Sequence, residues 1–244
     1  MMDVRQVETS RAWHWVMDGW ALFRKNPRNW IFMTLAYLVI ALGLDFIPWI
    51  GSLVFVLLAP ALTGGMLYGA DQLARGGQLD LSHLIQAFRI RSLTHLMFML
   101  GAISLVGGLL LGLVGGGLVT GSVLGGILRG PATHLGSLFV GTGMLSLVAL
   151  LLMSATLVGL LFYAVPLVML SRLSPVDAIG LSLTACLRNW RPLGVLGLVS
   201  LGLALAALLT LGIGWLVLTP VLVGALYSSY RDLFGANPVR LDKF

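Results

Sequence analysis

The chain has 244 residues, of which 58% are hydrophobic and only 10% are charged. Soluble domains carry about 25% charged residues, so this composition excludes a soluble enzyme, a disordered protein and a disulfide scaffold. The net charge of +6 does not indicate nucleic-acid binding, because the basic residues flank long apolar runs instead of forming a basic patch. The sequence therefore predicts an all-α, polytopic membrane protein with a single integral membrane domain over residues 1–244.

Six apolar segments are candidates for crossing a bilayer, which takes roughly 20 residues. In chain order they pair as three helical hairpins, near 30–46 and 50–70, 95–117 and 146–170, and 193–211 and 215–230. An irregular, glycine-rich segment is expected between the two middle spans. The sequence leaves open whether residues 115–145 are re-entrant, external or part of longer helices.

The basic residues predict the orientation of these spans. With six spans, segments 1–28, 71–94, 172–192 and 231–244 lie on one side, and they contain 14 of the 15 Lys and Arg residues. The opposite side contains Arg129 alone. Because Lys and Arg concentrate on the cytoplasmic side, we expect a bacterial inner-membrane protein with both termini in the cytoplasm.

A short amphipathic helix is predicted at the interface before each hairpin. Its candidate N-caps are Ser10, Ser82 and Ser174. The apolar faces are formed by Trp13, Met17, Trp20 and Phe23, then Leu81, Leu84, Ile85 and Phe88, then Val176, Ile179, Leu183 and Leu187. We therefore predict three quasi-repeat units, about 9–75, 80–172 and 174–235, each with one amphipathic helix and one hairpin. The alternative explanation for their likeness is chance similarity among apolar segments.

Each amphipathic helix ends in an arginine, namely Arg24, Arg89 and Arg188. These three side chains are candidates for contact with lipid headgroups or with a protein partner. The alternative is that the helices form a structural collar around the spans. Membrane lipids are therefore the expected partners, together with a membrane or cytoplasmic protein, and nucleic acid is not expected.

Small residues recur along the third span. Gly108, Gly112 and Gly116 are spaced four residues apart, which predicts a groove where helix backbones approach closely. The alternative is a broken or re-entrant segment near 115–130, buried in protein or lining a watery cavity. A polar cavity lined by Ser104, Thr120 and Ser122 would favour that alternative.

Two stretches carry a resemblance to known proteins, Gly19–Pro27 (GWALFRKNP) and Ser182–Trp190 (SLTACLRNW). With these motifs the chain resembles a family of uncharacterised proteobacterial inner-membrane proteins with six spans. It is also similar to the integral membrane domain that precedes some glycerophosphodiester phosphodiesterases. The resemblance implies a fold and a location, and it supplies no catalytic residue because the soluble phosphodiesterase domain is absent from this sequence.

The sequence offers little for chemistry. None of the four histidines belongs to an HExxH-type motif or has a second histidine or a cysteine at helical spacing. The six predicted spans have no Asp, Glu, Lys or Arg in their interiors, which argues against proton-coupled transport or voltage sensing. We expect no enzymatic activity, no metal and no cofactor. The leading hypothesis is a non-enzymatic structural or interaction component of the membrane. The alternative is a transporter or channel for a neutral or lipidic solute, and kinks at Pro60, Pro166 and Pro220 could open a lateral cleft for lipid.

Overall fold

The computed structural model describes residues 4–48, 50–129 and 142–235, with side chains except at 118–129 and 142–146. The regular secondary structure of these residues is helical, which confirms the all-α prediction for them. In chain order the elements are α1 (Arg11–Lys25), α2 (Pro27–Asp45), α3 (Ile50–Ala74), the 3-10 helix η1 (Leu81–Ile85), α4 (Gln86–Arg89), α5 (Arg91–Arg129), α7 (Thr142–Phe162), α8 (Ala164–Ser171), α9 (Pro175–Arg188), α10 (Trp190–Leu209) and α11 (Trp215–Phe234).

Five helical segments within the described part of the chain are long and apolar enough to cross a membrane. They are α2, α3, Arg91–Gly117 of α5, Leu147–Ser171 across α7 and α8, and α10. The sixth predicted span lies in α11, which carries Arg231 and Asp232 in its last turn and is not one of the five. The chain is thus a multi-pass helical membrane protein, and the sixth span stays a prediction.

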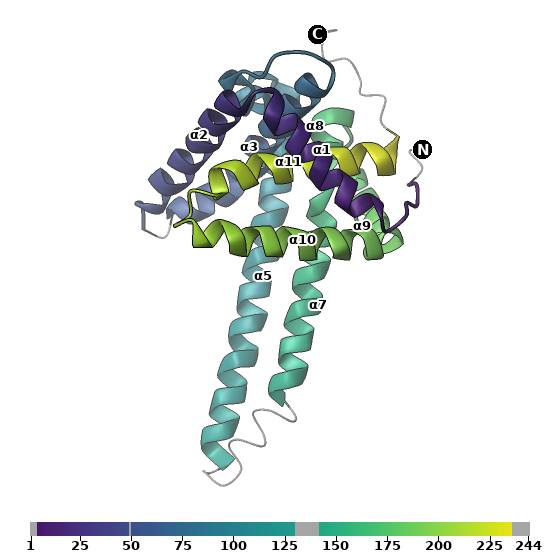
Figure 1. Ribbon diagram of the computed structural model, residues 1–244. Coiled ribbons are helices and arrows are strands. Elements are labelled where there is room, and N and C mark those ends of the chain that lie inside the picture. The colour runs from purple at the N-terminus through teal and green to yellow at the C-terminus, as the bar shows by residue number, and fades with distance from the viewer. Residues whose placement is uncertain (1–3, 49, 130–141, 236–244) are drawn as a thin grey trace.

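The long helices do not share one direction (Figure 1). α5 and α7 lie side by side and project away from the other helices, whereas α10 runs across them. α2 packs on α3, and α10 packs on α11, so the two helices of each predicted hairpin are in contact. The arrangement of the three hairpins across a membrane stays a prediction.

The third predicted span continues well beyond residue 117. α5 remains helical to Arg129, and α7 begins at Thr142. The expected irregular segment and the broken-helix alternative are therefore wrong for residues 118–129, and the re-entrant alternative stays a prediction. A continuous helix satisfies the backbone hydrogen bonds of this glycine-rich apolar run internally, which an irregular segment cannot do in lipid. The rest of the expected irregular segment, at 130–141, lies outside the described residues.

The predicted helix starts have mixed outcomes. Ser174 caps α9 as expected, because its hydroxyl accepts a hydrogen bond from the backbone N–H of Asp177 at 3.2 Å. Ser82 is not the cap of η1. Instead, the carboxylate of Asp80 accepts from the backbone N–H of Ser82 at 2.7 Å. The side chain of Ser10 makes no capping bond and donates to the carboxylate of Glu8 at 3.3 Å.

The amphipathic helices leave large apolar side chains exposed and bury small ones. Small residues are buried in all three, namely Ala12 and Gly19 of α1, Ala87 of α4, and Ala178, Ser182 and Ala185 of α9. The exposed large apolar residues include Trp13, Met17 and Trp20 of α1, Leu81 and Ile85 of η1, and Val176 and Leu187 of α9. α1 additionally buries Trp15, Val16, Leu22 and Phe23. Of the three faces predicted from sequence, only Phe23 and Leu84 are fully buried.

Each amphipathic helix packs on the second long helix of another predicted unit. α1 packs on α11, η1 packs on α3, and α9 packs on α7 and α8. Glycines allow close approach at all three contacts: Gly224 of α11 meets α1, Gly65 of α3 meets η1, and Gly159 of α7 lies against Cys186 of α9. The arrangement links the first and last units of the chain, and the repeat origin of the units stays a prediction.

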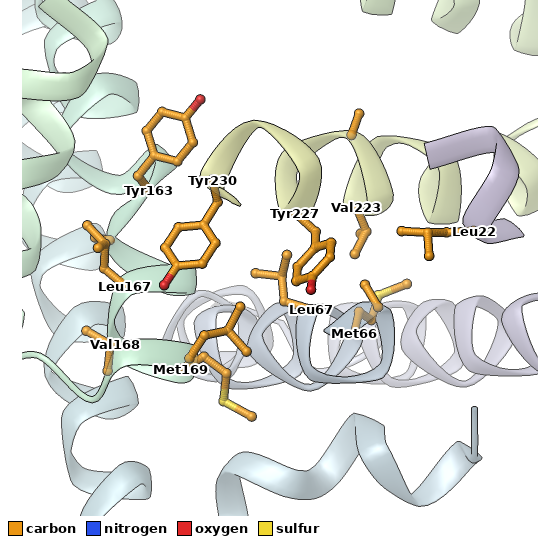
Figure 2. Close-up of a cluster of buried hydrophobic side chains, with 14 of the residues drawn as sticks. Leu22, Met66, Leu67, Tyr163, Leu167, Val168, Met169, Val223, Tyr227 and Tyr230 are labelled. Atoms are coloured by element: carbon orange, nitrogen blue, oxygen red, sulfur yellow. The ribbon is translucent and has the colours of Figure 1, made fainter. Parts of the chain in front are cut away.

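The core lies where α3, α8 and α11 meet (Figure 2). Tyr227 and Tyr230 project from α11 toward α3, beside Leu67, and Leu167 approaches from α8. Tyr230 is buried and shares a 2.5 Å hydrogen bond with the hydroxyl of Ser171. The core therefore joins helices from all three predicted units, and it supports the walls of the site described next.

Candidate functional site

A large cleft lies beside α7, between that helix and α3, α9, α10 and α11. Its volume is about 900 Å³, within the range of roughly 300–1,000 Å³ that is typical of ligand pockets. Most of the lining side chains are apolar, and no Asp, Glu, Lys or Arg belongs to the described lining. The lining also includes residues with hydroxyl, thiol and indole groups, among them Thr63, Ser200, Thr219 and Trp215.

One wall of the cleft is fixed by α9. The hydroxyl of Ser182 donates to the carbonyl oxygen of Gly159 at 2.7 Å and accepts from the backbone N–H of Tyr163 at 2.9 Å. Tyr163 separates α7 from α8, so this one buried hydroxyl satisfies a carbonyl in the last turn of α7 and the N–H at the helix break. The thiol of Cys186 also points to the Gly159 carbonyl, at 3.6 Å. Burial raises the pKa of the Cys186 thiol to about 11, so the wall is uncharged at neutral pH.

The junction of α9 and α10 forms one end of the cleft. Leu187 and Trp190 line it there and are 67% and 65% exposed. The guanidinium of Arg191 lies 5.3 Å from the centre of the Trp190 ring, a cation–π geometry. An apolar cavity thus ends beside an indole and a basic group, both of which are suited to a membrane–water boundary.

The chain near its N-terminus is tied to the same junction. Nη1 of Arg188 donates to the carbonyl oxygen of Val4 at 3.1 Å, and the amide of Asn189 donates to the carbonyl of Arg5 at 3.1 Å. On its other side, the backbone N–H of Arg5 donates to the carbonyl oxygen of Leu233 in α11 at 2.8 Å. The N-terminal segment therefore bridges the α9–α10 junction and the end of α11.

A polar network joins α1, α3 and α11 away from the large cleft. Asp232 accepts from Nε of Arg11 at 2.9 Å and from the indole N–H of Trp15 at 2.7 Å. Asp71, only 4% exposed, accepts from the Tyr227 hydroxyl at 2.8 Å and pairs with Arg75 at 2.9 Å. A smaller cleft of about 400 Å³ borders this network. Both acids already have hydrogen-bond or ion-pair partners within the protein. We therefore interpret the network as a structural contact that holds these helices together.

The three predicted arginines occupy different surroundings. Arg24 is exposed with its guanidinium 5.9 Å from the Trp20 ring, and Arg89 is exposed at the end of α4. Arg188 is exposed but anchors the N-terminal segment through Val4. The structure does not bring these three side chains into one cluster by any described contact, and their contact with lipid or a partner stays a prediction.

The predicted glycine groove faces outward. A Cβ built on Gly108, Gly112 or Gly116 would meet no atom within 4 Å. The contact between α5 and α7 instead uses the neighbouring positions Gly107 and Gly115, where a Cβ would approach side-chain atoms of Leu157 at 2.5 Å and Leu150 at 2.9 Å. Within one chain the groove is thus unoccupied, so its packing role stays a prediction.

The structure also reveals site residues that the sequence reasoning missed. The cleft was not expected beside α7, and Arg191 was not singled out. A signal was available, since Trp190 is the last residue of the recognised motif and Arg191 directly follows it at a predicted span boundary. The expected cavity near Ser104 differs from the cleft found. Ser104 lies outside the described cleft lining and donates within its helix to the Leu100 carbonyl at 2.8 Å, and the side chains of Thr120 and Ser122 lie outside those described.

The described residues contain no group of three or more His, Cys, Asp or Glu side chains placed to hold a metal ion. What the geometry offers is therefore a neutral apolar cavity with a basic, aromatic end. Such an arrangement can hold a hydrocarbon chain and orient a polar group attached to it.

Comparison with known proteins agrees with a membrane protein. No family model matches the chain, and no solved structure matches it. The resemblance to the membrane domain of glycerophosphodiester phosphodiesterases accordingly stays a prediction. The chain is similar to a protein of Burkholderia thailandensis named as a probable inner membrane protein, with 25% identity over an alignment that covers 97% of this chain and 95% of that protein.

Proposed function

We propose that the chain is a bacterial inner-membrane protein with six spans, three hairpins and both termini in the cytoplasm, and that it acts as a non-enzymatic structural or interaction component. The relative's description supports the location. The 14-to-1 distribution of Lys and Arg supports the orientation. The six spans are the five apolar segments together with α11.

The observation that carries an interaction role is the outward face of the amphipathic helices. Trp13 of α1 is 56% exposed, Val176 of α9 is 72% exposed, and Leu81 of η1 is 49% exposed. A helix in a soluble protein would bury these side chains, whereas a helix at a membrane boundary can place them in lipid or against another membrane protein. Arg24, near Trp20, and Arg89 are then placed to meet headgroups or an acidic partner surface.

Topology reporters test the membrane arrangement. Fusions of a fluorescent protein and of alkaline phosphatase after residues 90 and 212 should give fluorescence at 90 and phosphatase activity at 212. A pair of fusions after residue 235 tests α11: fluorescence is expected there, and phosphatase activity at 235 would show that α11 does not cross the membrane. The fluorescent fusion after residue 90 serves as the control for cytoplasmic folding of the reporter.

In-cell photocross-linking tests the interaction role. A photoreactive amino acid at Met17, on the outward face of α1, should give a discrete protein adduct that is lost on Arg24→Glu. The same probe at the fully buried Trp15 is the control and should give none. If position 17 yields lipid adducts alone, the protein-partner part of the proposal fails.

The cleft of about 900 Å³ favours a second candidate, a transporter or channel for a neutral or lipidic solute. Proteoliposomes should then exchange a fluorescent phospholipid between leaflets, measured by dithionite bleaching. Ala155→Trp, which fills the cleft, should abolish exchange, whereas Ala102→Trp, on an exposed position of α5 outside its lining, should not. A bulky residue at Gly112 should also have no effect on the cleft. If the unaltered protein does not exchange the phospholipid, the transporter candidate fails and the structural or interaction component remains as the proposed function.

A further inference from the structure

The large cleft has the shape of a site for a chain molecule. On α7 its lining extends from Leu152 to Phe162, a distance of about 15 Å at roughly 1.5 Å per helical residue. This is about half of the roughly 30 Å hydrocarbon thickness of a bilayer. A ligand that fills it would thus lie within one leaflet.

The walls are suited to methylene groups. Thr156 directs its hydroxyl to the carbonyl of Leu152 at 2.8 Å, and Cys186 directs its thiol to the carbonyl of Gly159. Both polar groups are therefore engaged within the protein, and neither requires a polar ligand. Since the described lining also contains no charged side chain, the cavity itself favours an apolar occupant.

The end of the cleft at the α9–α10 junction is suited to a polar group attached to the apolar part of the ligand. Trp190 lines the cleft and carries the guanidinium of Arg191 against its ring at 5.3 Å. A guanidinium forms charge-assisted, frequently bidentate hydrogen bonds with phosphate oxygens. Arg188, the last residue of α9 and three positions before Arg191, adds a second positive charge at the junction. This charge is complementary to an anion.

We propose that the cleft is a binding site for one phospholipid with an anionic headgroup, its acyl chain between α7, α10 and α11 and its phosphate at Arg191 beside Trp190. The inference rests on the membrane placement proposed above and deepens the second candidate function by naming the class of ligand. Binding of this lipid does not depend on exchange between leaflets. An experiment can therefore refute the binding site and the transport function independently of each other.

Native mass spectrometry of the purified full chain tests the site, with dioleoyl phosphatidylglycerol and dioleoyl phosphatidylcholine as probes. One phosphatidylglycerol molecule should remain bound, retained about tenfold better than phosphatidylcholine. Ala155→Trp should remove the adduct, and Arg191→Gln should reduce the preference for phosphatidylglycerol about fivefold. The matched controls are Ala102→Trp and Arg28→Gln, because Arg28 stacks on Phe32 at 5.9 Å at the start of a different helix.

Labelling of the single cysteine provides a second readout in protein that has kept its fold. Cys186 lines the cleft, so added phosphatidylglycerol should slow its modification by an alkylating reagent several-fold, and inorganic phosphate should not. Equal retention of both lipids, retention unchanged by Ala155→Trp, or a preference unchanged by Arg191→Gln would each overturn the assignment. Protection by inorganic phosphate alone would indicate an anion site without a place for the acyl chain, and would overturn it as well.

Discussion

Gly19 of α1 and Gly224 of α11 face one another at a crossing where there is no room for a side chain. A Cβ on Gly224 would lie 2.7 Å from the Cα of Gly19, and a Cβ on Gly19 would lie 2.8 Å from the backbone nitrogen of Ala225. The two residues are 205 positions apart in the chain (224 − 19 = 205). Their contact therefore closes the fold by joining its first helix to its last.

Gly19→Ala should consequently destabilise the protein. The added methyl group meets backbone atoms that cannot move independently, and overpacking of this kind costs about 1–3 kcal/mol. We expect a lower temperature of aggregation in detergent. Gly180→Ala is the control, since a Cβ there meets nothing within 4 Å and should be neutral or slightly stabilising. Equal behaviour of the two variants would contradict the close packing of α1 on α11.

Asp232→Asn should weaken the same contact through its polar groups. Asp232 accepts from Arg11 and from the indole of Trp15, and hydrogen bonds to charged groups are worth about 1.5–3 kcal/mol. The side chain of Arg11 is 40% exposed, and solvent screening weakens its interaction with Asp232. We therefore expect the free energy of unfolding to fall by about 1–2 kcal/mol.

Asp18→Asn is the control for this variant, because Asp18 lies exposed and accepts from the hydroxyl of Ser228 at 2.6 Å, a bond that an amide oxygen can also accept. Thermal unfolding followed by tryptophan fluorescence compares the two. A loss for Asp18→Asn as large as that for Asp232→Asn would show that charge in this region, and not the Trp15 and Arg11 contacts, sets the stability.

His83 should make stability depend on pH. Burial lowers the pKa of His83, an effect increased by Arg89 and opposed by Asp80. The folded protein thus binds fewer protons at this site than the unfolded chain, whose histidine has a pKa of about 6.5. The stabilising contribution is present above that value and is lost as the pH falls below it.

The hydrogen-bond geometry agrees with this direction, since Nδ1 of His83 accepts from the backbone N–H of Asp80 at 3.3 Å. His83→Asn, which keeps an acceptor but does not titrate, should flatten the decline in thermal stability between pH 7.5 and pH 5.5. His14→Asn, at an exposed position of α1, should leave the decline as it is. If the thermal stability of His83→Asn falls as steeply between pH 7.5 and pH 5.5, another titrating group is responsible for the decline.

Cys186 should react slowly with thiol reagents in the folded protein. With its pKa raised to about 11 by burial, against about 8.5 for an ordinary thiol, the thiolate population at pH 7.5 is lower by more than two orders of magnitude. The comparison is a Cys186→Ser protein with a cysteine introduced at the exposed Gly180 on the same helix. We expect that site to react at least tenfold faster with a maleimide, and both should react alike after unfolding in detergent. Equal rates before unfolding would show that the cleft wall is open to water.

The sequence was most informative about the long helices. Their apolar length and lack of charge exceed what a soluble fold requires, and these are properties of segments that need no tertiary contact. The start of α9 was predictable for the same reason, because Ser174 and Asp177 lie within one turn. The cap of η1 was missed because the neighbouring carboxylate of Asp80 competes for the same role as Ser82.

The sequence by itself thus determined the class of protein and the approximate positions of the long apolar helices, and it predicts the side to which the basic residues belong. Tertiary structure decided which face of each helix is buried: Gly107 and Gly115 pack on α7 while Gly108, Gly112 and Gly116 remain open, and α1 keeps Trp13 outside and Trp15 inside. The physical reason is that lipid is as apolar as a protein core. Hydrophobicity cannot select a face there, and the choice falls to close packing of small residues and to polar contacts between distant segments.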